Sequence, residues 1–441
     1  MRRILFCLLI ICSGHLTPAS ARPMLPAMAT WNSTVPVFNN NQEIFRAGAA
    51  LRIITPNPLL PVSGGIGQPN PVHEKQGDLF VRALVLEKGS LRVAIVSIDN
   101  LGWTAILGDR SRQLVKGILP ENILIGATHT HSAPDAYAFP DENGKTGADM
   151  PYLDWCVHQV ADAINEALSK LQAATLKSVV AKVNGRIAYN YYAEDLYDPR
   201  CGVMQFIDRE KGNTIATLVN YAVHPEVIGP SRGILSPDLC GPLYERIESK
   251  TGGVAIFMNS AQGGMVTADN RAEGGKERND YDECRRIGNL LADESLRILA
   301  DAPDQKNPEL FCASARIAFP VSSPIMKYIL NNSPLKSTQT KGDTIYTRLN
   351  LLNIGRAQLL TIPGEALPNI GFYVKRHMHT DQPFLFGLTN DAFGYMLTKV
   401  DFMSFSKYDY VSRTSLGEMT GEIYMEEALK LINRCPPASG K

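Results

Sequence analysis

The sequence predicts an α/β fold in which a largely buried mixed β-sheet is flanked by helices. Short apolar runs such as 92–98 and 122–127 alternate along the chain with stretches of helical periodicity, a pattern typical of α/β proteins. These runs are almost continuously apolar, as in strands that are covered on both faces. A length of 441 residues with 44% hydrophobic residues is sufficient for a single large domain.

The individual elements follow from the same patterns. A helix is expected over 152–171, because Leu153, Val157, Val160 and Ile164 recur at intervals of three and four residues. Further helices are expected over 281–300 and 367–378. The expected strands are 92–98, 122–127, 214–223, 253–258, 357–362 and 384–388.

Two polar stretches interrupt this alternation. Residues 261–282 are rich in glycine, asparagine and charge, and residues 322–347 carry asparagine, serine, threonine and lysine. Both are expected to lie on the surface, as candidates for a lid or for a loop that lines a site.

The N-terminus has the three parts of a secretory signal. Arg2 and Arg3 form a basic region, residues 4–12 are apolar, and residues 19–21 (ASA) form a small-residue cleavage site. We expect cleavage after Ala21 and a secreted or periplasmic protein. Residues 22–44 are expected to form an extended arm, residues 45–434 the single domain, and residues 435–441 a tail.

The charge and cysteine content of the chain argue against some classes of function and site. The chain has 44 basic and 44 acidic residues, which argues against a nucleic-acid binder. No segment after the signal is long and apolar enough to suggest a transmembrane helix, and association with a membrane surface is left open. The six cysteines that remain after cleavage include no CxxC pair, so they do not suggest a zinc site, whereas disulfides and buried thiols are equally compatible with them.

Residues that commonly bind metals follow the ends of predicted strands. His129 and His131 follow the run 123–127, His224 follows 217–223, Glu365 follows 359–362, and Tyr395 lies beyond 384–388. Ligands of α/β sheets bind where strands end at their carboxyl edge, so these side chains converge if the strands run parallel. Imidazole and oxygen donors without a thiolate suit Zn²⁺ or another first-row divalent ion.

Simpler interpretations exist for each of these residues. A lone histidine at a strand end is more often a hydrogen-bonded structural residue. In extended backbone the two rings of a His-x-His pair face opposite sides, so one ring could bind metal while the other faces a substrate. The GPSRG sequence of 229–233 matches a serine-hydrolase expression, but Pro225 and Pro230 break the strand that a nucleophile elbow needs.

The motifs together resemble the neutral ceramidase family, zinc amidases that cleave N-acylsphingosine. The resemblance covers most of the chain after the signal, in the order of the family, and its combination of motifs is specific. It rests on 53–56 (IITP), 95–99 (IVSID), 128–132 (THTHS), 223–225 (VHP), 362–365 (IPGE) and 390–395 (NDAFGY).

The resemblance implies a role for each matching residue. The family's zinc ligands correspond to His129, His224, Glu365 and Tyr395. His131 matches the histidine that faces the substrate and handles protons, and the resemblance assigns Tyr410 to the tyrosine that helps to hold the scissile carbonyl.

The chain also departs from the family pattern. Val266 and Gly264 stand where the family has a serine and an aspartate, Thr267 is one place beyond that serine, and Tyr191 stands where the family has a substrate-contacting arginine. We expect the ceramidase-like domain alone, without the immunoglobulin-like domain that follows it in the family.

We therefore expect an exported zinc-dependent amidohydrolase that uses a metal-activated water on an N-acyl or lipid amide, with sphingolipid-like amides among the candidates. A shift of the loop could instead make Thr267 the nucleophile. The alternatives are an esterase or another metal hydrolase at the same site, and a catalytically inactive homologue that binds the metal or a ligand.

Overall fold

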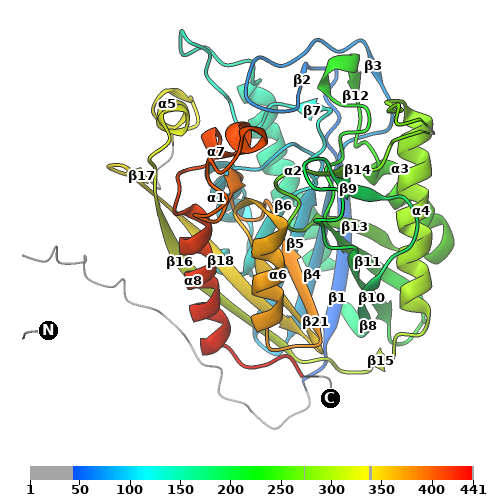
Figure 1. Ribbon diagram of the computed structural model, residues 1–441. Coiled ribbons are helices and arrows are strands. Elements are labelled where there is room, and N and C mark those ends of the chain that lie inside the picture. The colour runs from blue at the N-terminus through cyan, green and yellow to red at the C-terminus, as the bar shows by residue number, and fades with distance from the viewer. Residues whose placement is uncertain (1–42, 273, 337–339, 440–441) are drawn as a thin grey trace, which may run out of the picture. The chain divides into compact units, whose positions relative to one another are not determined.

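The computed structural model describes residues 43–272, 274–336 and 340–439, which form an α/β domain (Figure 1). The predicted signal peptide and the predicted arm up to residue 42 lie outside the described residues. Within them the predicted α/β class with a mixed sheet is confirmed, and the predicted strands and helices occur within about two residues of their expected bounds. The helix expected over 281–300 is α4 (Tyr281–Ala300).

The larger sheet is mixed and runs in the order β13-β11-β10-β8-β1-β4-β5-β6, with β15 paired to β8. Its pairs β5/β6 and β11/β13 are parallel, and the other pairs are antiparallel. Its strands are β1 (Arg46–Ile53), β4 (Phe80–Lys88), β5 (Leu91–Ile98), β6 (Ile123–Ala127), β8 (Gln172–Lys182), β10 (Arg200–Asp208), β11 (Thr214–Tyr221), β13 (Val254–Asn259) and β15 (Asp304–Gln305).

A second sheet runs in the order β16-β18-β19-β21, with β17 paired to β18, and its β19/β21 pair is parallel. Its strands are β16 (Leu310–Pro320), β17 (Thr340–Lys341), β18 (Thr344–Ile354), β19 (Ala357–Thr361) and β21 (Gln382–Phe386). Short pairs join β2 (Val62–Ser63) to β7 (Ala133–Pro134), β3 (Glu74–Lys75) to β12 (Ile234–Leu235), β9 (Ala188–Asn190) to β14 (Val266–Ala268), and β20 (Gly364–Ala366) to β22 (Phe393–Met396).

The two sheets share one apolar core. The larger sheet curls so that β13, at one edge, contacts β4, β5 and β6 at the other, and the Ser97 hydroxyl of β5 donates to the Phe257 carbonyl of β13 at 2.6 Å. Leu84, Phe206 and Ile256 of the larger sheet are fully buried together with Phe384 of the second sheet. Both sheets thus bury one face in a common interior, which explains their continuous apolar runs.

Helices cover the remaining faces of the sheets (Figure 1). α2 packs on β1 and β4, α3 and α4 pack together and cover β13, β10 and β8, and α8 packs on α6 and β16. The side chains of Asp149 and Asp280 cap α2 and α4 by accepting from backbone N–H groups three residues on. The helices are α1 (Ala105–Leu114), α2 (Met150–Ser169), α3 (Cys240–Thr251), α4 (Tyr281–Ala300), α5 (Pro324–Asn332), α6 (Pro368–His377), α7 (Asp409–Arg413) and α8 (Thr420–Arg434), with 3₁₀ turns at Pro120–Asn122, Pro230–Arg232 and Ser406–Tyr408.

The carboxyl ends of strands from both sheets meet at one place. The amide of Asn220, near the end of β11, donates to the carbonyls of Met258 and Asn259 in β13 and of Leu385 in β21, at 2.8, 3.0 and 2.8 Å. The N–H of Ala127, at the end of β6, donates to the Leu388 carbonyl at 3.2 Å. The loops that follow these strands therefore start side by side.

The prediction that both polar stretches lie on the surface is wrong in part. Residues 261–268 are largely buried, because Gly263 lets this segment approach the β20 backbone so closely that a Cβ there would lie 2.3 Å from the Glu365 carbonyl oxygen. Within 322–347, α5 turns Met326 and Ile329 inward and lines a pocket, as the expectation of a site-lining segment allowed.

No helix in the described part of the chain has the length and hydrophobicity needed to cross a membrane. The structure joins none of its six described cysteines in a disulfide, and five of them are buried. Of the two interpretations that the sequence left open for these residues, the structure therefore shows free thiols.

Candidate metal centre

His129 and His131 leave the end of β6 on the same side. The His129 backbone has a positive φ of 74°, so the segment is not extended and the expected alternation of the two rings does not apply. The ring centroids lie 4.8 Å apart and nearly perpendicular. His129 Nδ1 lies 2.5 Å from the Leu101 carbonyl, which fixes the orientation of its ring.

His224 reaches the same place from the end of β11. Its backbone N–H and its Nδ1 both contact the Val266 carbonyl oxygen at 2.8 Å, so this one oxygen of β14 fixes both the backbone and the ring of His224. Its side chain is fully buried, and its ring centroid lies 4.8 Å from that of His129 and 5.7 Å from that of His131.

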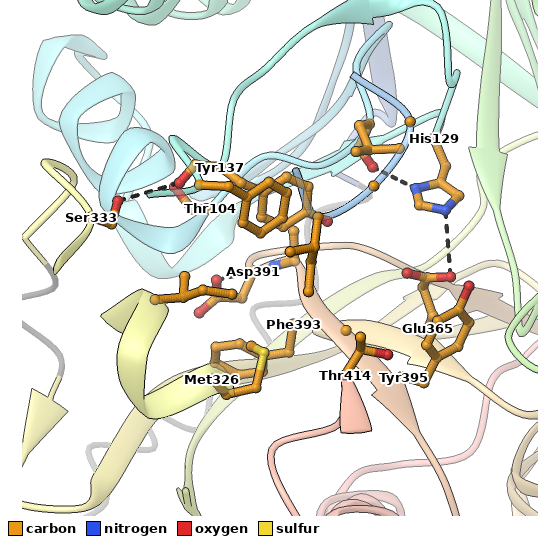
Figure 2. Close-up of a pocket in the computed structure, with 18 of the residues that line it drawn as sticks. Thr104, His129, Tyr137, Met326, Ser333, Glu365, Asp391, Phe393, Tyr395 and Thr414 are labelled. Carbon is orange, nitrogen blue, oxygen red and sulfur yellow. Dashed lines mark hydrogen bonds and ion pairs between the residues drawn. The ribbon is translucent and has the colours of Figure 1, made fainter. Parts of the chain in front are cut away.

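Glu365 completes the cluster from β20. Its Oε2 lies 3.1 Å from His224 Nε2 and 3.4 Å from His129 Nε2. Glu365 pairs in register with Tyr395 across the parallel β20/β22 ladder, and Figure 2 shows the two side chains next to each other below His129. The structure thus brings together His129, His131, His224, Glu365 and Tyr395, which are remote in sequence.

The hydrogen bonds of the two rings define what they present to Glu365. Because a backbone carbonyl only accepts, His129 and His224 must carry hydrogen on Nδ1. In their neutral forms both rings therefore direct an Nε2 lone pair towards a carboxylate oxygen. Only a proton or a metal cation between these acceptors makes the arrangement favourable.

The pKa shifts reflect the same crowding of acceptors. Burial would raise the pKa of Glu365, but His129 and His224 outweigh it and hold this pKa well below its usual range. Burial would lower the pKa of His224, whereas its hydrogen bond to Glu365 and the charges of Glu226 and Glu365 raise it to about 9. In the absence of metal, a proton on His224 takes the place that a cation would fill.

The donor set fits a divalent cation. One nitrogen from each of His129, His131 and His224 lies within 4.8 Å of the others, and all three residues are buried. Glu365 Oε2 lies closer still to two of these rings. The group is therefore compatible with a metal site to which histidines of this cluster and Glu365 contribute ligands.

His131 differs from the other two histidines in its contacts. Its Nδ1 lies 3.3 Å from Glu226 Oε2, and its buried Nε2 has no hydrogen-bond partner among the described residues. Burial, together with the charges of His129 and His224, lowers the pKa of His131 well below its usual value, which keeps the ring neutral. We did not predict Glu226 from the sequence, although it follows His224 by two residues, because a single glutamate in a loop carries no pattern.

Two tyrosines border the cluster. The Tyr395 hydroxyl donates to Met265 Sδ at 3.0 Å, and the Tyr410 ring lies 5.8 Å from the Tyr395 ring. Both residues line the same pocket as His129, His131 and Glu365. Burial raises the pKa of Tyr410 to about 12, so its hydroxyl is a hydrogen-bond donor at neutral pH.

The positions that depart from the family pattern lie outside the pocket or act through their backbone. Val266 is buried and contributes the carbonyl that orients His224. Thr267 bridges to the His224 backbone, but it does not line the pocket. Tyr191 is 61% exposed, contacts Tyr192 edge to face, and is likewise absent from the pocket lining.

The cluster opens into an apolar pocket of about 450 Å³. One wall comes from Met326, Ile329 and Leu330 of α5, and another from the stacked rings of Tyr137 and Phe139, whose centroids lie 4.7 Å apart. Figure 2 shows Met326, Phe393 and Tyr137 on the side of the pocket away from His129. An apolar pocket with a few convergent polar groups is typical of a small-molecule site.

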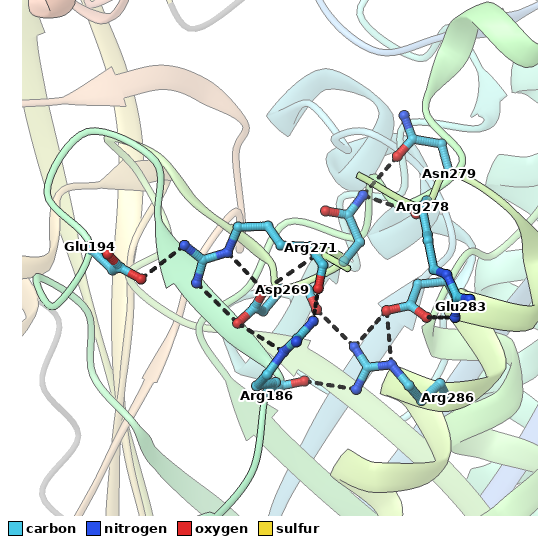
Figure 3. Close-up of polar contacts among 9 residues, drawn as sticks. Arg186, Glu194, Asp269, Arg271, Arg278, Asn279, Glu283 and Arg286 are labelled. Carbon is cyan, nitrogen blue, oxygen red and sulfur yellow. Dashed lines mark hydrogen bonds and ion pairs between the residues drawn. The ribbon is translucent and has the colours of Figure 1, made fainter. Parts of the chain in front are cut away.

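A polar network holds the segment that follows β14 against α4 (Figure 3). Arg271 makes two hydrogen bonds to the Asp269 carboxylate at 2.9 and 3.1 Å and a third to Glu194 at 2.8 Å. Arg286 of α4 donates to Glu283 at 2.6 Å and to the Asp269 carbonyl at 2.8 Å. The network anchors the end of β14, the strand that orients His224.

Fold and site together define an α/β protein with a buried cluster of three histidines and a glutamate at converging strand ends. This cluster opens to an apolar pocket.

Solved structures share the α/β fold of this chain. The structure is similar to the crystal structure of neutral ceramidase from Pseudomonas aeruginosa, with a TM-score of 0.71 and 17% identity over 91% of this chain and 76% of that chain. It is equally similar to a ceramidase complexed with C2, with a TM-score of 0.71 and 17% identity over 90% of this chain and 77% of that chain.

The sequence is also similar to that of a neutral ceramidase. The chain is 24% identical over 267 residues to neutral ceramidase of Pseudomonas aeruginosa, a match that covers 54% of this chain and 39% of that protein. The match thus spans well under half of the relative's length. No protein-family model matches the chain. The resemblance to the neutral ceramidase family predicted from the motifs is confirmed, and the α/β fold is that of a solved neutral ceramidase.

Proposed function

We propose that this protein is a metal-dependent hydrolase that cleaves the amide bond of an N-acyl substrate with water. The observation that carries the proposal is the buried convergence of His129, His224 and Glu365, whose acceptor atoms face one another at 3.1 and 3.4 Å beside an apolar pocket. The resemblance to neutral ceramidase supports a hydrolase and, within that class, an amide of a lipid.

The residues proposed to hold a zinc ion are His129, His224, Glu365 and Tyr395. A bound Zn²⁺ would polarise the substrate carbonyl and lower the pKa of a coordinated water towards ~7. The buried pair β20/β22 supplies two of these residues and the ends of β6 and β11 supply the others, so rigid elements position all four.

His131 is proposed to move the proton. Its Nε2 is neutral, buried and unpartnered, and it borders the pocket, so it can accept a proton from the attacking water and deliver it to the leaving amine. Tyr410 can donate a hydrogen bond to the oxygen on which negative charge develops. Water adds its hydroxyl to the acyl carbon and its proton to the amine nitrogen, so the products are a carboxylic acid and an amine.

Water rather than Thr267 is proposed as the nucleophile. Val266 occupies the position of the family serine and has no hydroxyl, and Thr267 does not line the pocket. These departures also favour the competing hypothesis of a non-catalytic homologue, because the family's serine and arginine positions are both changed. Metal content and turnover separate the two.

The test is elemental analysis of the purified protein combined with hydrolysis of a panel of N-lauroyl amides. We expect about one zinc per chain and amide turnover in the wild type. His224→Ala should lose both, whereas His131→Ala should keep the metal and lose turnover by about 10²–10⁴-fold. The exposed His158 of α2 offers a matched control, and His158→Ala should change neither.

Two results would contradict the proposal. Metal without turnover of any amide would favour the non-catalytic homologue, and full zinc occupancy in His224→Ala would remove this residue from the ligand set.

We also propose that the protein is exported, from the signal-like sequence of residues 1–21. N-terminal sequencing of the mature protein should begin at Arg22. A retained N-terminus would contradict this proposal.

A further inference from the structure

The charged residues of the pocket all have the same sign. Glu226, Glu365 and Asp391 contribute carboxylates, and no lysine or arginine occurs among the described residues that line the pocket. Tyr191, which stands at the family's arginine position, lies outside the lining, so it supplies no cation either. An anionic group that enters this pocket therefore finds no lysine or arginine among the described lining residues to offset its charge.

Two of the three carboxylates already have partners. Glu365 faces His129 and His224, and Asp391 accepts hydrogen bonds from the backbone N–H groups of Ala105 and Ala392, both at 3.0 Å. Asp391 is also only 5% exposed. Neither carboxylate is free to contact a substrate group directly.

Glu226 is different, because it remains accessible. Its side chain is 23% exposed at the pocket, and its one ion-pair contact within the described part of the chain is the 3.3 Å approach to His131 Nδ1. His131 is the residue proposed to protonate the leaving amine. Glu226 therefore borders the pocket next to the residue that would protonate the leaving amine, whereas the pocket residues of α5 are mainly apolar.

We propose that Glu226 makes this pocket selective for N-acyl substrates whose amine part is neutral or positively charged, against those that carry a carboxylate or another anion beside the scissile amide. The proposal rests on the proposed function. Its physical basis is the repulsion between the Glu226 carboxylate and a nearby anion of the substrate, in a partly buried pocket whose described lining residues include no lysine or arginine. The apolar walls take the acyl chain of either kind of substrate, so they do not discriminate.

The test compares three amides that share a lauroyl chain and differ only in the amine: N-lauroylethanolamine, N-lauroylethylenediamine and N-lauroylglycine. For the wild type we expect kcat/KM for the glycine amide to be at least about tenfold below that for the ethanolamine amide. In Glu226→Gln this ratio should shrink to within about threefold. The measured quantity is the ratio of kcat/KM for the two substrates. If Glu226→Gln slows catalysis through His131, it slows both substrates equally, and this effect cancels in the ratio.

A matched control removes a charge elsewhere. Glu309 is half exposed and pairs with Lys88, away from the pocket, and Glu309→Gln should leave the ratio unchanged. Should Glu226→Gln fold poorly, the wild type at about 0.02 M and about 0.5 M salt gives a second measurement, since screening should narrow the ratio.

The proposed function and this inference fail in different ways. If no amide is hydrolysed, the proposed function is wrong, and binding of the same three amides, measured by calorimetry, still tests the selectivity. Equal binding or cleavage of the glycine and ethanolamine amides by the wild type, or a ratio that Glu226→Gln leaves unchanged, would overturn the inference.

Discussion

At the scale of single residues, the positions of the hydrogens on His129 and His224 decide which ring nitrogens face Glu365. The carbonyls of Leu101 and Val266 bind the Nδ1–H groups of His129 and His224, so both Nε2 atoms face Glu365. Such backbone contacts fix the tautomer of a metal-binding histidine before the metal arrives. In the proposed metal site, a metal ion and a proton on His224 would compete for the space between these acceptor atoms.

This competition predicts how metal affinity depends on pH. Against the effect of burial, the hydrogen bond to Glu365 and the charge of Glu226 raise the pKa of His224 in the metal-free protein to about 9, well above the usual value for histidine, so the ring is protonated at pH 7 and this proton would have to leave when metal binds. We expect apparent zinc affinity to rise about tenfold per pH unit between about pH 7 and about pH 9 and then to level off. Chelator competition at several pH values measures this slope.

The same shift has a consequence for the stability of the metal-free protein. A raised pKa in the folded state contributes stability that is fully present below pH 6.5 and is lost as the pH rises through about 9. Metal-free protein should therefore lose stability towards pH 9, and zinc-bound protein should not.

His131→Ala provides the control for the binding measurement. It should leave the dependence of zinc affinity on pH unchanged, because the pKa of His131 is lowered and its ring carries no proton to displace. A changed dependence on pH would show that His131 is the competing group.

At the scale of elements, the helix α5 in the pocket wall begins at a side-chain cap, Ser323. The Ser323 hydroxyl accepts from the Met326 N–H at the start of α5 and donates to the Arg413 carbonyl of α7 at 2.8 Å. One side chain thus holds α5 and joins it to the segment that carries Tyr410.

We expect Ser323→Ala to destabilise the protein by about 1 kcal/mol, the usual cost of a lost N-cap. Urea unfolding measures this change. Because α5 lines the pocket with Met326 and Ile329, KM for long-chain amides should rise more than kcat falls. Ser249, an exposed serine of α3, provides a control, and Ser249→Ala should change stability by less than about 0.5 kcal/mol.

The elements show what the sequence could predict. Strands such as 92–98 and helices such as 281–300 were predictable, because burial on both faces and a 3.6-residue period leave a direct pattern. The burial of 261–268 was not predictable. It depends on the close approach of Gly263 to the backbone of Glu365, a residue remote in sequence, and only the folded chain shows this neighbour. The convergence of His129, His131, His224 and Glu365 could be expected, because each of them follows the end of a predicted strand. The contact between His131 and Glu226 could not be expected, because it too depends on a neighbour that only the folded chain shows.

At the scale of the whole molecule, the site depends on two sheets that share one core. β6 and β11 of the larger sheet supply the histidines, and β20 follows β19 of the second sheet and supplies Glu365. The relative position of the sheets therefore sets the distances within the cluster. Phe384 of β21 packs against Gly202 of β10, where a Cβ would lie 2.4 Å from the phenyl ring.

This contact predicts the effect of adding one methyl group between the sheets. Gly202→Ala should destabilise the protein by about 1–3 kcal/mol through overpacking, because Phe384 is fully buried and its rigid ring has no room to move. Phe384→Leu creates space at the same point, so the double variant should be more stable than the sum of the two single losses by about 1 kcal/mol. Urea unfolding of the four proteins measures this coupling, with Gly65→Ala as the control, since a Cβ there meets only the Tyr410 hydroxyl at 3.6 Å. Strictly additive losses would contradict the coupling expected from this contact, and with it the argument that this pair helps to set how closely the two sheets pack.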